Sequence, residues 1–106
     1  MTRSVIIHVT EEDIKGGTPR ESCECPVALA LNRRFPDFQA SVRAGYQIPM
    51  ARRVDDINKT LNNYLDLPPY SQDLIGDFVT QFDRGEGGMP FEFEVILKEK
   101  DAEEMI

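Results

Sequence analysis

The pattern of apolar and polar positions predicts four strands outside the ambiguous segment 50–67. Residues 4–9 (SVIIHV) are rich in β-branched side chains, which predicts a buried strand. Residues 38–44 alternate apolar with polar positions and predict a hairpin with a second strand at 46–48. Pro49 indicates that this second strand is short or lies at an edge of the sheet. Residues 91–97 (FEFEVIL) carry the most regular alternation and predict the clearest strand.

Three further segments carry helical signals. Residues 10–15 begin with the spacing of a capping box and precede two glycines, which predicts one helical turn. Residues 26–35 predict a second helix, because Pro26 suits the first position of a helix and Pro36 ends it. Residues 69–84 form the longest predicted helix, and Gly85 is typical of the residue that follows a helix. The apolar stripe of this longest helix consists of Leu74, Ile75, Phe78, Val79 and Phe82.

Residues 50–67 fit two different structures. Their apolar residues follow a helical spacing of three and four positions. Thr60 and Tyr64 instead favour a strand over 60–67, because both residue types are enriched in sheets. We expect the strand, and the helix stays open as the alternative.

The order of these elements predicts an α+β fold. In this fold, a small sheet of four to five mostly antiparallel strands carries two helices on one face. We expect a single domain over residues 1–98 and a charged, frayed tail over 99–106. The polar positions of the alternating strands then form a sheet face that meets water or a partner.

Charge is divided unevenly along the chain. The net charge is −7, yet residues 1–53 hold six acids and eight bases, whereas residues 54–106 hold thirteen acids and four bases. A single domain does not need this asymmetry to fold, so it indicates a partner. We expect an acidic surface that fits a basic groove on another protein, and the alternative is that these acids only keep the protein dissolved. The predicted partner-binding residues are Asp73, Asp77, Glu92 and Glu94.

A group of arginines offers a second surface. Five of them fall within a stretch that contains one acid, Asp37, and could form a patch for nucleic acid or phosphate. The sequence pI near 4.6 favours the alternative, in which these side chains pair with surface acids. The five residues are Arg33, Arg34, Arg43, Arg52 and Arg53.

The two cysteines are weak candidates for a metal or redox site. Cys23 and Cys25 are two positions apart, a spacing that suits neither a mutual disulfide nor a zinc site within one chain. They lie at the start of the helix predicted over 26–35, where the helix N-terminus lowers a thiol pKa. Structural cysteines are favoured, and a disulfide across a homodimer stays open.

The remaining inventory argues against catalysis. His8 is the one histidine and lies within a predicted strand, where a structural role is favoured over that of a general base. The glycines form no phosphate-binding motif, so we expect no enzyme and no cofactor. No apolar run reaches about 18 residues, and the apolar N-terminal stretch is too short for a signal peptide, so we expect a cytoplasmic protein without membrane contact.

Three segments together resemble a set of short, uncharacterised proteins found mostly in bacteriophages and related prokaryotic elements. They are CPVALAL (25–31), FVTQFDRG (78–85) and MPFEFEV (89–95). These motifs are helix and strand segments, so the resemblance implies no activity and no functional residue. It implies a context in which a small accessory protein or inhibitor binds a host protein in the host cytoplasm. The tail KEKDAEEMI (98–106) departs from the pattern.

We therefore expect a non-enzymatic binding protein that docks on a host protein through an acidic surface. Two alternatives remain at this point. One is a nucleic-acid-binding accessory protein that uses the arginine patch, and the other is a metal- or redox-linked protein that uses Cys23 and Cys25.

Overall fold

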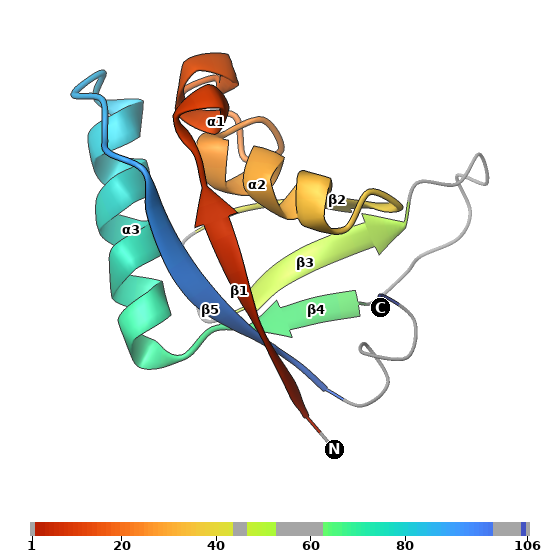
Figure 1. Ribbon diagram of the computed structural model, residues 1–106. Coiled ribbons are helices and arrows are strands. Elements are labelled where there is room, and N and C mark those ends of the chain that lie inside the picture. The colour runs from red at the N-terminus through yellow and green to blue at the C-terminus, as the bar shows by residue number, and fades with distance from the viewer. Residues whose placement is uncertain (1, 44–46, 53–62, 99–104, 106) are drawn as a thin grey trace.

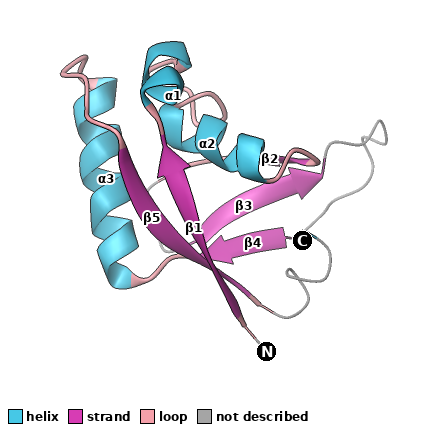
Figure 2. Cartoon of the chain, in the orientation of Figure 1, coloured by secondary structure: helices cyan, strands magenta, loops and turns pink. Residues whose placement is uncertain are grey.

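The computed structural model describes residues 2–43, 47–52, 63–98 and 105. Five antiparallel strands form one curled sheet in the order β1-β5-β4-β3-β2 (Figure 1). Together with three helices they confirm the predicted α+β fold (Figure 2). The elements are β1 (Arg3–Val9), α1 (Glu11–Gly16), α2 (Pro26–Arg34), β2 (Phe38–Ala40), β3 (Gln47–Arg52), β4 (Asn63–Asp66), α3 (Pro69–Asp83) and β5 (Phe91–Leu97).

The longest pairing between described residues joins β1 to β5. The two strands run antiparallel over seven residues, from Arg3 opposite Leu97 to Val9 opposite Phe91. Successive side chains point to opposite faces, so alternate residues of both strands enter the core. The buried set on these strands is Ile7, Val9, Phe93, Val95 and Leu97. The outward set includes Ser4, Ile6, His8, Glu92 and Glu94.

Helix α2 packs against β1 and β2 on the inner face of the sheet (Figure 1). Its first turns are apolar on several sides, and Val27, Ala28 and Leu31 are fully buried. Near its end, the Asn32 side-chain oxygen accepts the backbone N–H of Ala40 at 2.8 Å. This bond covers the outer edge of β2, which no further strand joins in the described part of the chain.

Helix α3 flanks β5 where β4 leaves it. β4 meets β5 at Asp66 opposite Ile96, and the chain then turns away to begin the helix. The Ser71 hydroxyl satisfies the backbone of β5 on this side. It donates to the Glu94 carbonyl at 2.8 Å and accepts the Glu94 N–H at 3.2 Å. The helix ends at Asp83 with Arg84 as its C-cap, and Gly85 follows as predicted, with a φ of 77° that suits the left-handed conformation of that position.

One ion pair joins α1, α2 and β1. Asp13 closes a capping box with Thr10 and is only 5% exposed. The Arg33 guanidinium donates to both carboxylate oxygens of Asp13 at 2.5 and 2.9 Å, and to the carbonyl of His8 at 2.9 Å. Burial by itself raises the pKa of Asp13, but the hydrogen bonds from Arg33 and Thr10 outweigh it and hold that pKa below its ordinary value of 3.8.

The expectation for Pro49 is wrong. It lies in β3, a six-residue strand between β2 and β4. The Ser41 N–H donates to the Pro49 carbonyl at 3.1 Å, so the backbone of Pro49 faces the side of β2. Because β2 ends at Ala40, which pairs with Met50, Pro49 lies beyond the ladder between β2 and β3. Its missing N–H therefore costs the sheet little. β2 is correspondingly shorter than the strand predicted over 38–44.

The ambiguous segment 50–67 is a strand at both of its described ends. Residues 50–52 belong to β3 and residues 63–66 belong to β4. The second of these strands lies within the strand predicted over 60–67. Residues 53–62 lie outside the described residues. Of the tail over 99–106, only Met105 is described, and its side chain is buried against the core.

The capping ion pair generates a prediction about stability and pH. Asp13→Ala removes a cap and two charge-assisted hydrogen bonds, so we expect it to lower the free energy of unfolding by about 2–3 kcal/mol at pH 7. Because the folded-state pKa of Asp13 is depressed, this contribution is present above the ordinary pKa and is lost as pH falls through the lower folded value. Urea unfolding at pH 7 and pH 3 measures both effects.

Glu11→Ala is the matched control, because Glu11 lies in the same helical turn and makes only an exposed pair with Lys15 at 3.6 Å. We expect it to cost under about 0.5 kcal/mol. An Asp13→Ala cost that is the same at both pH values would contradict the assigned role of the carboxylate.

Two glycines allow a second test. A Cβ on Gly88 would lie 2.5 Å from the ring of Phe78, whereas a Cβ on Gly76 in α3 would meet nothing within 4 Å. Gly88→Ala should therefore lower the free energy of unfolding by about 1–3 kcal/mol, and Gly76→Ala should raise it by about 0.5–1 kcal/mol. Thermal and urea unfolding of the two variants measure the difference, and two changes of the same sign would count against this packing.

Candidate functional site

Two carboxylates of β5 stand on the outward face of the sheet beside β1. Glu92 lies opposite His8, and its carboxylate is 3.1 Å from the His8 Nδ1, with both side chains about two-thirds exposed. Glu94 lies opposite Ile6. His8 is therefore an exposed partner of Glu92 and not a buried core residue.

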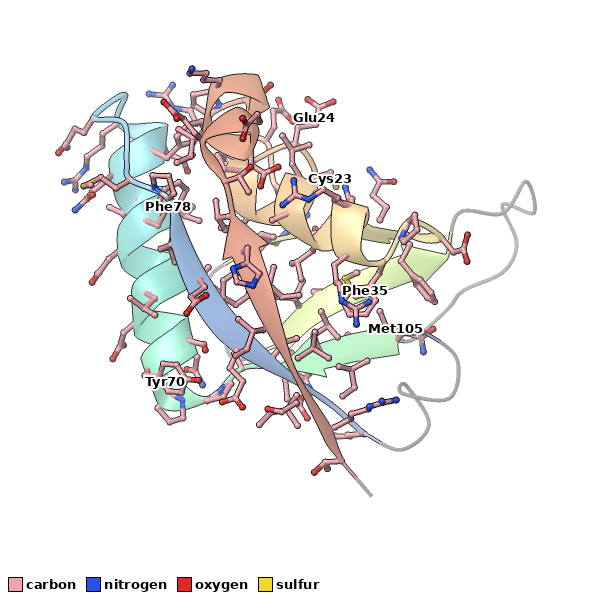
Figure 3. All side chains as sticks on the ribbon, viewed as in Figure 1. Cys23, Glu24, Phe35, Tyr70, Phe78 and Met105 are labelled. Atoms are coloured by element: carbon pink, nitrogen blue, oxygen red, sulfur yellow. The ribbon has the colours of Figure 1, made fainter. Side chains whose placement is uncertain are left out.

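Glu94 also ties the sheet to α3. Its carboxylate accepts hydrogen bonds from the Ser4 hydroxyl of β1 and, at 2.6 Å, from the Tyr70 hydroxyl of α3. The bond from Ser4, and then the bond from Tyr70, hold the pKa of Glu94 below its ordinary value of 4.5. The same carboxylate raises the pKa of Tyr70. Tyr70 lies at the N-terminal end of α3 (Figure 3), so this contact extends the outward face of β1 and β5 onto the helix.

Tyr70 belongs to a stripe of four exposed residues on α3. Tyr70, Asp73, Leu74 and Asp77 are three or four positions apart, so they form one stripe along the helix. All four are exposed. We name the combined feature the β1–β5–α3 surface, and its members are Ile6, His8, Tyr70, Asp73, Leu74, Asp77, Glu92 and Glu94.

Large apolar side chains are exposed on this surface among the acids. Ile6 is 47% exposed, Tyr70 52% and Leu74 42%. In the described part of the chain, the other exposed large apolar residues are Tyr64 and Met89. Leu74 is therefore not part of the buried stripe to which its spacing assigned it. The four predicted partner-binding acids lie on β5 (Glu92 and Glu94) and on the exposed stripe of α3 (Asp73 and Asp77).

The predicted arginine patch is divided between different places. Arg33 is held by Asp13, and the Arg34 guanidinium lies 4.9 Å from the centre of the Phe35 ring. Both line a hollow with residues of β1, whereas Arg43 lines a different hollow with residues of α3 that include Asp73. The side chain of Arg52 and the whole of Arg53 lie outside the described residues. The ion pair gives Arg33 a structural role, which leaves less of the patch for phosphate.

The cysteines occupy different environments. Cys25 caps α2, with its sulfur 3.5 Å from the Ala28 nitrogen, and it is buried. Burial raises the pKa of this thiol, so the expectation of a lowered pKa at the helix start is wrong for Cys25, because desolvation outweighs the helix terminus. Cys23 is half-buried, and both thiols are free.

The described residues contain neither a metal-binding cluster nor a membrane-spanning helix. No group of three or more His, Cys, Asp or Glu side chains is placed to hold a metal ion within residues 2–43, 47–52, 63–98 and 105. No helix in the same ranges has the length and apolar character needed to cross a membrane.

Comparison of the chain with protein-family models, with curated proteins and with solved structures finds no match. The site is therefore interpreted from its own geometry.

Sequence reasoning proposed the acids of this surface but not its apolar members. The segment 4–9 was interpreted as a buried strand, whereas in the structure Ser4, Ile6 and His8 are exposed on its outward face. Tyr70 and Leu74 could be found only by asking which side of α3 meets β5, and the Glu94 contact decides that. The pairing of Asp13 with Arg33 had no local signal, because twenty positions separate the two residues.

The hydrogen bonds of Glu94 generate a prediction about its titration. Removing the Ser4 hydroxyl by Ser4→Ala should raise the pKa of Glu94 towards 4.5, and Tyr70→Phe should raise it by a smaller amount. Carbon-13 NMR of the glutamate carboxyl groups between pH 2 and pH 7 measures these values. Ser41→Ala, which removes a hydroxyl that faces Ser22, is the control and should leave the titration unchanged. An unchanged Glu94 titration in both test variants would contradict the contact.

Proposed function

We propose that the protein is a non-enzymatic binding protein that docks on a basic surface of another protein through the β1–β5–α3 surface. The observation that carries the proposal is that the exposed Tyr70 bonds to Glu94, which lies opposite the exposed Ile6, and that Leu74 is exposed one helical turn further along α3. Neither feature alone would support docking, because isolated exposed apolar residues and solvated acids are both common.

The apolar residues would form the core of such an interface. Aromatic and large aliphatic side chains near the middle of an interface carry most of its binding energy, while a polar rim excludes water. The hydroxyl of Tyr70 is already held by Glu94, so the ring loses less conformational freedom when a partner covers it. Tyr70 is therefore the best candidate for an anchor.

The carboxylates supply the selectivity. Asp73 and Asp77 are exposed on α3, and Glu92 and Glu94 stand on β5, so both elements contribute carboxylates to this surface. A net charge of −7 adds a long-range attraction for basic partners. Lysine or arginine residues around an apolar patch are the complementary chemistry on the partner.

The resemblance to short phage-type proteins gives this proposal its context. In that context the partner is a host protein, and the protein acts as an accessory factor or inhibitor inside the host cell. The nucleic-acid alternative has less support, because Arg33 is committed to Asp13. The cysteine alternative has less support, because Cys25 is buried and its thiol pKa is raised.

The proposal predicts which substitutions abolish partner capture. In an affinity pull-down from host lysate, with proteins counted by mass spectrometry, Tyr70→Ala and Leu74→Ala should each reduce the recovered partner at least about tenfold. The double variant Asp73→Lys/Asp77→Lys should lose more capture at low salt than at high salt. The reason is that salt screens the attraction that these two acids provide, so less of it remains to be lost at high salt.

Tyr64→Ala is the matched control, since Tyr64 is an exposed tyrosine on β4. It should leave capture unchanged. Capture that is lost equally in the Tyr64 and Tyr70 variants, or retained in all of them, would refute this surface as the docking site.

A further inference from the structure

We propose that the free edge of β1 binds an extended acidic peptide segment of a partner, which adds to the sheet as a sixth strand next to Arg34. This site lies beside the β1–β5–α3 surface but uses the backbone of β1 and the end of α2. It does not rest on the docking function proposed above.

The orientation of β1 follows from Glu94. Both backbone groups of Glu94 bond to the Ser71 hydroxyl, so they point away from β1. In an antiparallel pair, two opposite residues either point their backbone N–H and C=O groups at each other or point all of these groups away from each other. Ile6 lies opposite Glu94, so its N–H and C=O point to the free edge of the sheet.

A second contact gives the same orientation independently. The carbonyl of His8 accepts a hydrogen bond from Arg33 at 2.9 Å, so the backbone of His8 also points away from β5. Backbone direction repeats every two residues along a strand, and therefore Ser4, Ile6 and His8 all face the free edge.

The other strand edges are covered by side chains. Asn32 accepts the Ala40 N–H on β2, and Ser71 bonds both groups of Glu94 on β5. On β1, Arg33 covers only the carbonyl of His8. Within the described residues, no hydrogen bond reaches the outward backbone groups of Ser4 and Ile6. An uncovered strand edge is a template for a further strand.

The chemistry next to this edge is basic and apolar. A hollow of about 330 Å³ lies between β1 and the end of α2, and its walls include Ile7, Ala30 and Arg34. Arg34 stacks on Phe35 and forms no ion pair with a carboxylate of the described ranges. A glutamate side chain on the incoming strand could lay its methylene groups over Ala30 and bring its carboxylate to Arg34.

The opposite face sets the complementary requirement. The outward side chains beside the edge are Ile6 and His8, with Glu92 and Glu94 behind them on β5. An acid on that face would be repelled, so the incoming strand should alternate an acidic side chain towards α2 with an apolar one next to Ile6. A second copy of the chain fits less well, because its β1 (Arg3–Val9) carries no carboxylate to meet Arg34.

The test uses two blocked heptapeptides, one of alternating valine and glutamate and one of alternating valine and lysine. Titration of the nitrogen-15-labelled protein by NMR should show binding of the glutamate peptide, with shifts centred on Ser4, Ile6 and Arg34, and at least about tenfold weaker binding of the lysine peptide. The one backbone hydrogen-bonding group that Ile6→Pro removes is an N–H that faces the free edge, so it should weaken binding at least about tenfold, whereas Ile6→Thr, which changes the side chain and keeps the N–H, should retain binding.

Arg34→Glu provides a second variant that does not alter the strand. It should reverse the preference between the two peptides. Tyr70→Ala should leave peptide binding unchanged, which separates this site from the docking surface. Equal binding of both peptides, no binding of either, or undiminished binding by Arg34→Glu would overturn the proposal. A concentration-dependent dimer that Ile6→Pro abolishes would overturn it in favour of a second copy of the chain.

Discussion

The antiparallel register between β1 and β5 is the constraint on which the other features depend. It places Ile7 and Phe93 together in the core, and it places Ile6 beside Glu94 on the outward face. A slip of one residue would turn the buried side chains of β1 outwards, so burial fixes this register strongly. The same register decides which backbone groups of β1 meet β5 and which face the free edge. The core, the outward face of β1 and β5 and the free strand edge are thus three consequences of one alignment.

The helices act on this sheet through single polar side chains as well as through packing. Ser71 of α3 occupies the edge of β5, Asn32 of α2 occupies the edge of β2, and Arg33 reaches β1 while it neutralises Asp13. Each side chain satisfies backbone groups that a neighbouring strand would otherwise take. The helices therefore define both where the sheet stops and which part of its border stays open.

Local periodicity accounts for much of what the sequence predicted. The strands at 4–9 and 91–97, the helices at 26–35 and 69–84 and the left-handed Gly85 after the last helix each depend on nearby residues, and the structure confirms them. Pro49 was misjudged because its effect depends on where β2 ends. Composition indicated the acids of the β1–β5–α3 surface, whereas its helical apolar members, Tyr70 and Leu74, required knowledge of how α3 meets β5. Contacts between residues distant in sequence, such as Asp13 with Arg33, leave no local pattern.

Amide hydrogen exchange along β1, followed by NMR, tests the central alignment most directly. The register and the two backbone contacts predict an alternation, in which the amides of Val5, Ile7 and Val9 are bonded to β5 and exchange slowly. The amides of Ser4, Ile6 and His8 face the free edge and should exchange much faster. Uniform protection along the strand, or slow exchange of Ser4 and Ile6 with fast exchange of Val5 and Ile7, would contradict the account.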